Sequence, residues 1–115
     1  MKRAIFIGTV LATLGVATVA IAAEHEILIL PNTYFPETTY LTPGDQVRFI
    51  NDSGDTHTIV AANEDWTIGP LDPEEEYVLM IDEEIERTFH NANILNSDGS
   101  YAVTGDVSFD DAPVD

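Results

Sequence analysis

Short apolar stretches alternate with polar turns along most of the chain. Residues 46–51 show the pattern best, because apolar and polar side chains alternate there with a period of two, as in a strand with one buried face. Strands are predicted over residues 25–30, 38–41, 46–51, 57–62, 77–81, 85–90 and about 103–109. No window past residue 23 has a convincing helical period. The pattern therefore predicts an all-β protein, an antiparallel Greek-key sandwich or barrel.

Proline and glycine mark the turns between these strands. Pro43-Gly44 predicts a turn over residues 42–45, and Gly69-Pro70 with Pro73 predicts another over residues 69–73. Residues 91–100 form a longer polar loop in this interpretation.

The first 22 residues have the pattern of a secretory signal peptide. Met1-Lys2-Arg3 is basic, residues 4–21 are apolar or small and carry no charge, and Ala20 and Ala22 supply the small side chains of a cleavage site. A membrane anchor is the alternative, since the run is almost long enough to span a bilayer. We expect a signal helix over residues 1–22 that is removed, a domain over residues 23–115 with a short acidic tail, and bacterial-type export to a periplasmic or secreted location.

Acidic residues dominate the charge. The chain has a formal net charge of −17, and loss of Lys2 and Arg3 with the signal would leave two arginines against 21 acidic side chains. This composition argues against nucleic acid and anionic membrane surfaces as partners. It is compatible with a solvating surface or with a surface that attracts cations or a basic protein partner. The chain also has no cysteine, so the fold contains no disulfide.

Several motifs occur in the order found in the cupredoxins, the small Greek-key sandwiches that include plastocyanin and pseudoazurin. Tyr34-Phe35-Pro36, residues 41–51 (LTPGDQVRFIN) and His57-Thr58 resemble the family's F-x-P, G-D-x-V-x-F-x-N and H-x sequence. Residues 71–77 and 105–109 resemble a later hairpin and the closing strand. The resemblance implies a cupredoxin-like fold for most of residues 23–115.

The resemblance implies only part of the family's copper site. That site uses one histidine after the N-x(n)-H turn, then a cysteine, a second histidine and usually a methionine from the last long loop. Only His57 matches. Thr88-Phe89-His90 falls where the family has Y-x-C, which puts His90 at or near the cysteine position, and Val103 falls where methionine is usual. A blue-copper electron carrier is therefore excluded.

A different metal site remains a hypothesis. If His57 and His90 lie on neighbouring strands at one end of the sandwich, two imidazoles could bind copper or another divalent ion, with Asp55 or Asn93 as a third ligand. The alternative is that both histidines are structural.

A second possible metal site lies at residues 23–25. Cleavage after Ala22 would start the chain Ala23-Glu24-His25, whose amine, amides and imidazole could bind Cu(II) or Ni(II) in a square plane.

No pattern indicates an enzyme, because no nucleophile motif, phosphate loop or distinct acid–base pair is present. We expect an exported cupredoxin-like protein that binds copper or another divalent metal through a His-based site. The alternative is a metal-free cupredoxin-fold module whose acidic surface engages a partner.

Overall fold

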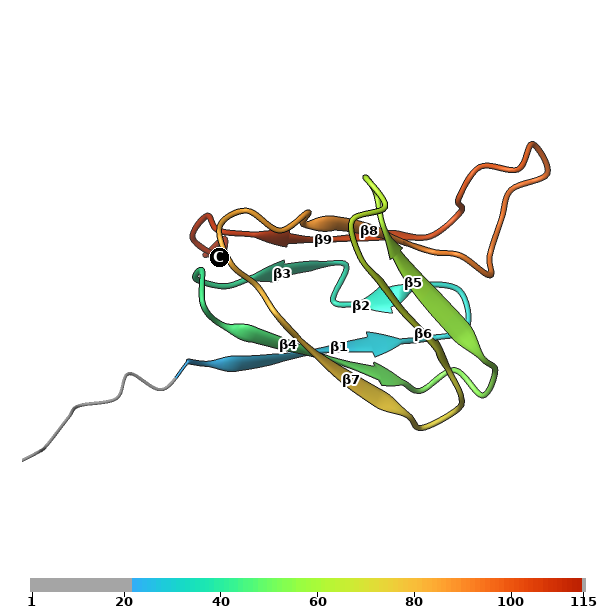
Figure 1. The fold of residues 1–115 in the computed structure, drawn as a ribbon, viewed down its shortest axis with the longest axis horizontal. Helices are drawn as coiled ribbons and strands as arrows, with labels where there is room; N and C mark the ends of the chain where they lie inside the picture. The colour runs from blue at the N-terminus through green and yellow to red at the C-terminus, as the bar shows by residue number, and fades with distance from the viewer. Residues whose placement is uncertain (1–21, 115) are drawn as a thin grey trace, which may run out of the picture.

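Two β-sheets pack face to face in a computed structural model that describes residues 22–114 (Figure 1). The four-stranded sheet has the order β2 (Tyr34–Phe35), β1 (Glu24–Ile29), β4 (Gln46–Asn51) and β7 (Glu76–Met80). The five-stranded sheet has the order β3 (Thr38–Tyr40), β9 (Thr104–Ser108), β8 (Thr88–Asn91), β5 (His57–Ala61) and β6 (Thr67–Leu71). The predicted all-β sandwich is confirmed. Most pairs are antiparallel, but β1 runs parallel to β4 and β3 parallel to β9.

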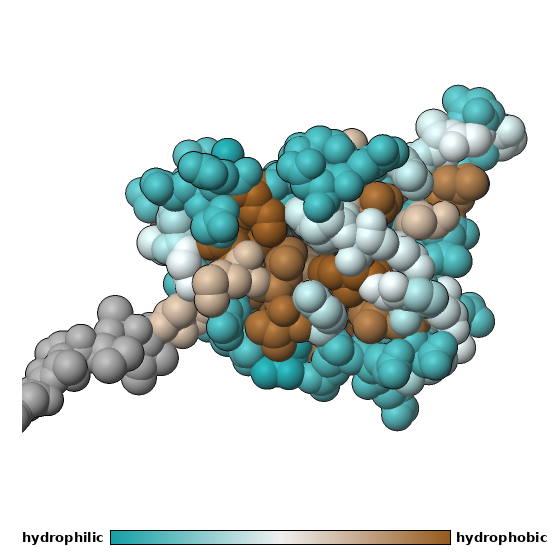
Figure 2. Space-filling model, viewed as in Figure 1, coloured by the Kyte–Doolittle hydropathy of each residue, from teal (hydrophilic) through white to brown (hydrophobic). Residues whose placement is uncertain are grey.

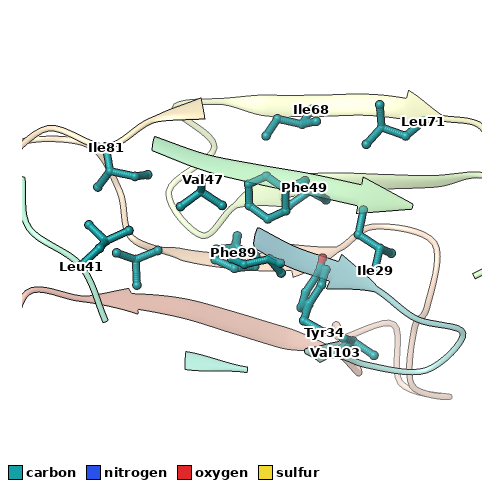
Figure 3. Close-up of a cluster of buried hydrophobic side chains, with 13 residues drawn as sticks. Ile29, Tyr34, Leu41, Val47, Phe49, Ile68, Leu71, Ile81, Phe89 and Val103 are labelled. Carbon is teal, nitrogen blue, oxygen red and sulfur yellow. The ribbon is translucent and has the colours of Figure 1, made fainter. Parts of the chain in front are cut away.

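The core lies between the sheets and contains the side chains that alternate inward along the central strands. In β4, Val47 and Phe49 are buried, and in β8 Phe89 is buried. Phe89 stands edge-on to Phe49 at 5.3 Å between ring centroids and to Tyr34 at 5.0 Å (Figure 3). Edge-to-face geometry is favourable for aromatic pairs, so these three rings tie β2 and β4 of one sheet to β8 of the other.

Gly105 in β9 allows the Phe89 ring to lie against the backbone. A Cβ at this position would come within 2.6 Å of the Phe89 ring and 3.0 Å of Tyr34. The position therefore needs glycine because of close packing, and its φ is not of the left-handed kind that glycine favours.

The prediction of a turn over residues 69–73 was partly wrong. Residues 69–71 belong to β6, and the pairing with β5 shifts register between His57 and Ile59, so β6 carries one extra residue there. Gly69 has φ +114°, and a Cβ on it would come within 2.9 Å of the Leu71 nitrogen and 3.0 Å of the His57 carbonyl oxygen. The Gly-Pro pair thus forms a bulge beside His57, and the turn follows at residues 72–75.

The proposed signal peptide and its helix lie almost entirely outside the described residues, which begin at Ala22. Within residues 22–114, no helix has the length and apolar character needed to cross a membrane.

Candidate functional site

His57 is the first residue of β5 and points into the sandwich. Its side chain is only 5% exposed, and it follows the phase of the buried residues Ile59 and Ala61 on the same strand. The bulge in β6 lies directly beside it, because His57 pairs with Leu71. The strand alternation and the bulge together place an imidazole at the polar end of the core.

Asn91 at the end of β8 contacts this imidazole. The distance from Asn91 Nδ2 to His57 Nδ1 is 3.2 Å, and Asn91 Oδ1 accepts the Asn93 N–H at 2.9 Å. Because Oδ1 already serves as an acceptor, the amide group facing His57 is the donor, so His57 Nδ1 accepts and the ring proton lies on Nε2. Nε2 is buried and has no partner among the described residues.

The nitrogen that faces β8 is therefore used in a hydrogen bond to a neutral amide. In the cupredoxins that this sequence resembles, a cysteine lies next to the first histidine of the copper site. The sequence predicted that His90 would occupy the position of that cysteine. The structure puts Asn91 there, one residue further along. The alternation of β8 could have indicated this, since the apolar Phe89 must face the core and Asn91 shares its face.

His90 lies on the opposite face of β8. It pairs with Val60, whereas Asn91 pairs with the buried Ile59. The His90 ring stacks on Tyr101 with 4.5 Å between centroids and 9° between planes, and its Nδ1 lies 2.8 Å from Thr104 Oγ1. The structure thus does not bring His57 and His90 together, because the sheet separates the two rings.

The candidate third ligands are held in turns. Asn93 Oδ1 accepts the Thr58 N–H at 2.7 Å, which fastens the loop after β8 to β5. Asp55 is exposed, and its backbone carbonyl accepts the Asn51 side-chain amide at 2.7 Å. Asn51 also donates to the Leu71 carbonyl at 2.8 Å. These contacts explain the turn residues as supports of the His57 end of the sandwich.

His25 is part of the sheet. It lies in β1 paired with Val47, and its Nε2 is 3.1 Å from Asp45 Oδ2. Asp45 also accepts the Ala23 N–H at 3.2 Å and the Thr42 N–H at 3.1 Å. These hydrogen bonds, that of Thr42 first, hold the pKa of Asp45 below its usual range. A square-planar site at residues 23–25 would have to withdraw His25 from Asp45 and from the pairing with β4.

The described side chains do not fit the copper site that the fold family implies. Residues 22–114 contain no group of three His, Cys, Asp or Glu side chains placed to hold one ion. The thiolate is absent because the chain has no cysteine, and the position facing His57 is an amide.

Both arginines of the described chain are engaged with neighbours. Arg48 bonds to Glu24 and Glu76 on the flanking strands β1 and β7, which raises the pKa of its guanidinium. The Arg87 guanidinium carbon lies 4.2 Å from the centroid of the Phe109 ring. The remaining surface charge is therefore almost all negative.

Comparison with known proteins shows the fold and little else. No protein family matches the sequence, and no curated protein is similar to it. Among solved structures, the chain is similar to the Cu-containing nitrite reductase (NirK) from Thermus scotoductus SA-01, with a TM-score of 0.59 and 14% identity. The alignment covers 84% of this chain and 24% of the reductase chain, so this protein spans about a quarter of its length. This likeness supports a cupredoxin-like β-sandwich.

Proposed function

We propose that this chain is an exported cupredoxin-fold binding module that engages a protein partner and holds no copper between His57 and His90. The main support is the arrangement around β8. His57 Nδ1 accepts a hydrogen bond from the Asn91 amide, while His90 lies on the other face against Tyr101 and Thr104. Zinc–nitrogen and similar bonds are about 2 Å long, so two rings on opposite faces of one sheet cannot share an ion.

The surface supports the binding role. With its arginines engaged, the described chain presents mainly carboxylates, which attract a basic partner and repel other copies of the chain. Export through the segment before Ala23 would place this surface outside the cytoplasm, and mass spectrometry of the secreted protein's N-terminus checks that step.

Isothermal titration distinguishes this function from metal binding. Copper(II), zinc(II) and nickel(II) are added to the metal-free protein and to the variants His57→Ala, His90→Ala and His25→Ala. We expect no site tighter than about micromolar that depends on both His57 and His90, since about 8 kcal/mol of binding free energy would need several good ligands. A tight site lost in both of these variants would overturn the proposal. A site lost only in His25→Ala would identify the N-terminal motif instead.

A further inference from the structure

Strand β7 is the edge strand that the fold leaves least protected. A sheet edge presents unpaired N–H and C=O groups, and proteins normally blunt it with short strands, proline or bulges. The other three edges use these devices: β2 has two residues, β3 has three, and β6 contains Pro70 and the bulge. In contrast, β7 runs for five residues in unbroken register with β4 and contains neither proline nor glycine.

The hydrogen bonds between β7 and β4 show which backbone N–H and C=O groups of β7 are unpaired. The Ile81 N–H donates to the Asp45 carbonyl at 2.9 Å, so Ile81 faces β4, and alternation gives Leu79 and Tyr77 the same direction. Val78 and Met80 therefore turn their N–H and C=O groups away from β4. Within residues 22–114, no hydrogen bond reaches these groups from any other segment.

Three apolar or aromatic side chains of β7 are exposed. Tyr77 is 47% exposed, Val78 38% and Met80 57%. In Figure 1, β7 lies at the front of the molecule, and Figure 2 shows hydrophobic residues on this face between hydrophilic margins. An added strand would cover both the open backbone groups and these side chains.

Acidic residues flank β7 at both ends. Glu74, Glu75 and Glu76 occur at its start, residues 82–84 (Asp-Glu-Glu) follow its end, and all six are exposed. No lysine or arginine occurs between residues 72 and 86, and among the described residues Glu76 is the only one of the six in an ion pair, with Arg48 on β4. A second copy pairing through β7 in antiparallel fashion would place each acidic cluster against the opposite acidic cluster, which like-charge repulsion disfavours.

We infer that the β7 edge binds an extended segment of another protein that has a β-forming, apolar centre and lysine or arginine at both ends. The segment adds an antiparallel strand beside β7, its backbone bonding to Val78 and Met80. Five strand residues span about 17 Å, which exceeds the Debye length of about 8 Å at physiological salt, so each acidic cluster acts on its own end of the partner. This inference rests on the proposed function and names the surface that performs it.

The test uses the synthetic peptide Lys-Lys-Thr-Val-Thr-Val-Thr-Lys-Lys as the probe and NMR hydrogen exchange as the readout. The peptide should slow exchange of the Val78 and Met80 amides at least tenfold, whereas the amide of Leu79, already bonded to β4, should change little. A peptide with glutamate in place of lysine should not bind, and a peptide N-methylated at its central residues should bind at least tenfold more weakly.

Charge variants provide the matched control. Glu74→Lys with Glu83→Lys should weaken peptide binding at least tenfold, because neither side chain forms a hydrogen bond in the described structure and both flank β7. Glu64→Lys with Asp111→Lys changes the net charge equally at exposed positions outside the two clusters, where the described structure gives neither side chain a hydrogen bond, and should have an effect below about threefold.

Three results would overturn the inference: equal binding of the glutamate peptide, absence of protection at Val78 and Met80, or a dimer of the protein alone that protects these amides. If the lysine peptide binds but protects another part of the surface, the β7 inference fails while the proposed partner-binding function stands. A tight paired-histidine metal site would instead remove the proposed function without changing the β7 result.

Discussion

The contact between His57 and Asn91 predicts a measurable coupling between two buried positions. A double-mutant cycle with His57→Ala, Asn91→Ala and the double variant isolates it, because the two side chains meet at 3.2 Å across β5 and β8. His90 supplies the control. It is adjacent to Asn91 in sequence but lies on the other face of the sheet, so a second cycle joins His57→Ala with His90→Ala.

The expected changes in the free energy of unfolding depend on which hydrogen-bonding groups each substitution leaves unpaired. Asn91→Ala leaves the buried His57 Nδ1 without its donor, which costs about 1–3 kcal/mol, and removes the part-buried hydrogen bond from the Asn93 N–H, worth about 1 kcal/mol. A net destabilisation of about 2–4 kcal/mol is expected for this variant. The coupling with His57 should be about 1 kcal/mol, the net value of one hydrogen bond. The coupling between His57 and His90 should stay within about 0.5 kcal/mol, as for residues without contact.

Urea unfolding monitored by Trp66 fluorescence and by circular dichroism measures these free energies, in chelator-treated protein so that trace metal plays no part. Unchanged slopes would show that the variants alter stability and not the unfolded state. An additive His57–Asn91 cycle would refute the contact. A coupling near 1 kcal/mol between His57 and His90 would show that the two rings interact and would refute their placement on opposite faces.

Three further changes test the core and the first strand. Gly105→Ala should destabilise the protein by about 1–3 kcal/mol in the same urea assay, because the new Cβ would meet the Phe89 ring at 2.6 Å; an unchanged midpoint would contradict this packing. Tyr34→Phe should leave stability unchanged or raise it by about 1 kcal/mol, since the buried Tyr34 hydroxyl has no partner among the described residues and burial raises the pKa of its phenol; a loss above about 1 kcal/mol would indicate a hydrogen bond at that hydroxyl. The pKa of Asp45 is lowered in the folded protein, so its carboxylate contributes its full stabilisation above about pH 4. That contribution is lost as the pH falls through the folded-state pKa. Asp45→Asn should therefore lower the free energy of unfolding at pH 7 and make it less dependent on pH in the acid range. An equal dependence on pH in that range for the two proteins would contradict that assignment.

The strands were predictable where burial has a simple period. Residues 46–51 were predicted as a strand with the bounds observed for β4, because polar and apolar side chains alternate there without interruption. Residues 69–71 were not, because Gly69-Pro70 has the local chemistry of a turn and the tertiary contact with β5 makes it a bulge. The prediction followed the turn preference of Gly-Pro, whereas the packing of β6 against β5 places these residues in a strand.

The site was predictable only in part. The position of His57 after its polar turn followed from the motif, but its burial and its neighbour depend on how β5 and β8 align. The spacing of the motif predicted His90 as the neighbour of His57. Because Phe89 faces the core and side chains alternate along β8, Asn91 faces the core as well and occupies that position. The stacking of Tyr101 on His90 brings together residues across the long loop after β8, and no local pattern indicates it.

The most direct test of the account is a zinc(II) titration of the protein labelled with ¹⁵N, followed through the ring nitrogens of His57 and His90. The His57 spectrum should show a proton on Nε2 and an unprotonated Nδ1, and one equivalent of zinc should not shift both rings together. Simultaneous shifts of both rings, saturating at one equivalent, would contradict it.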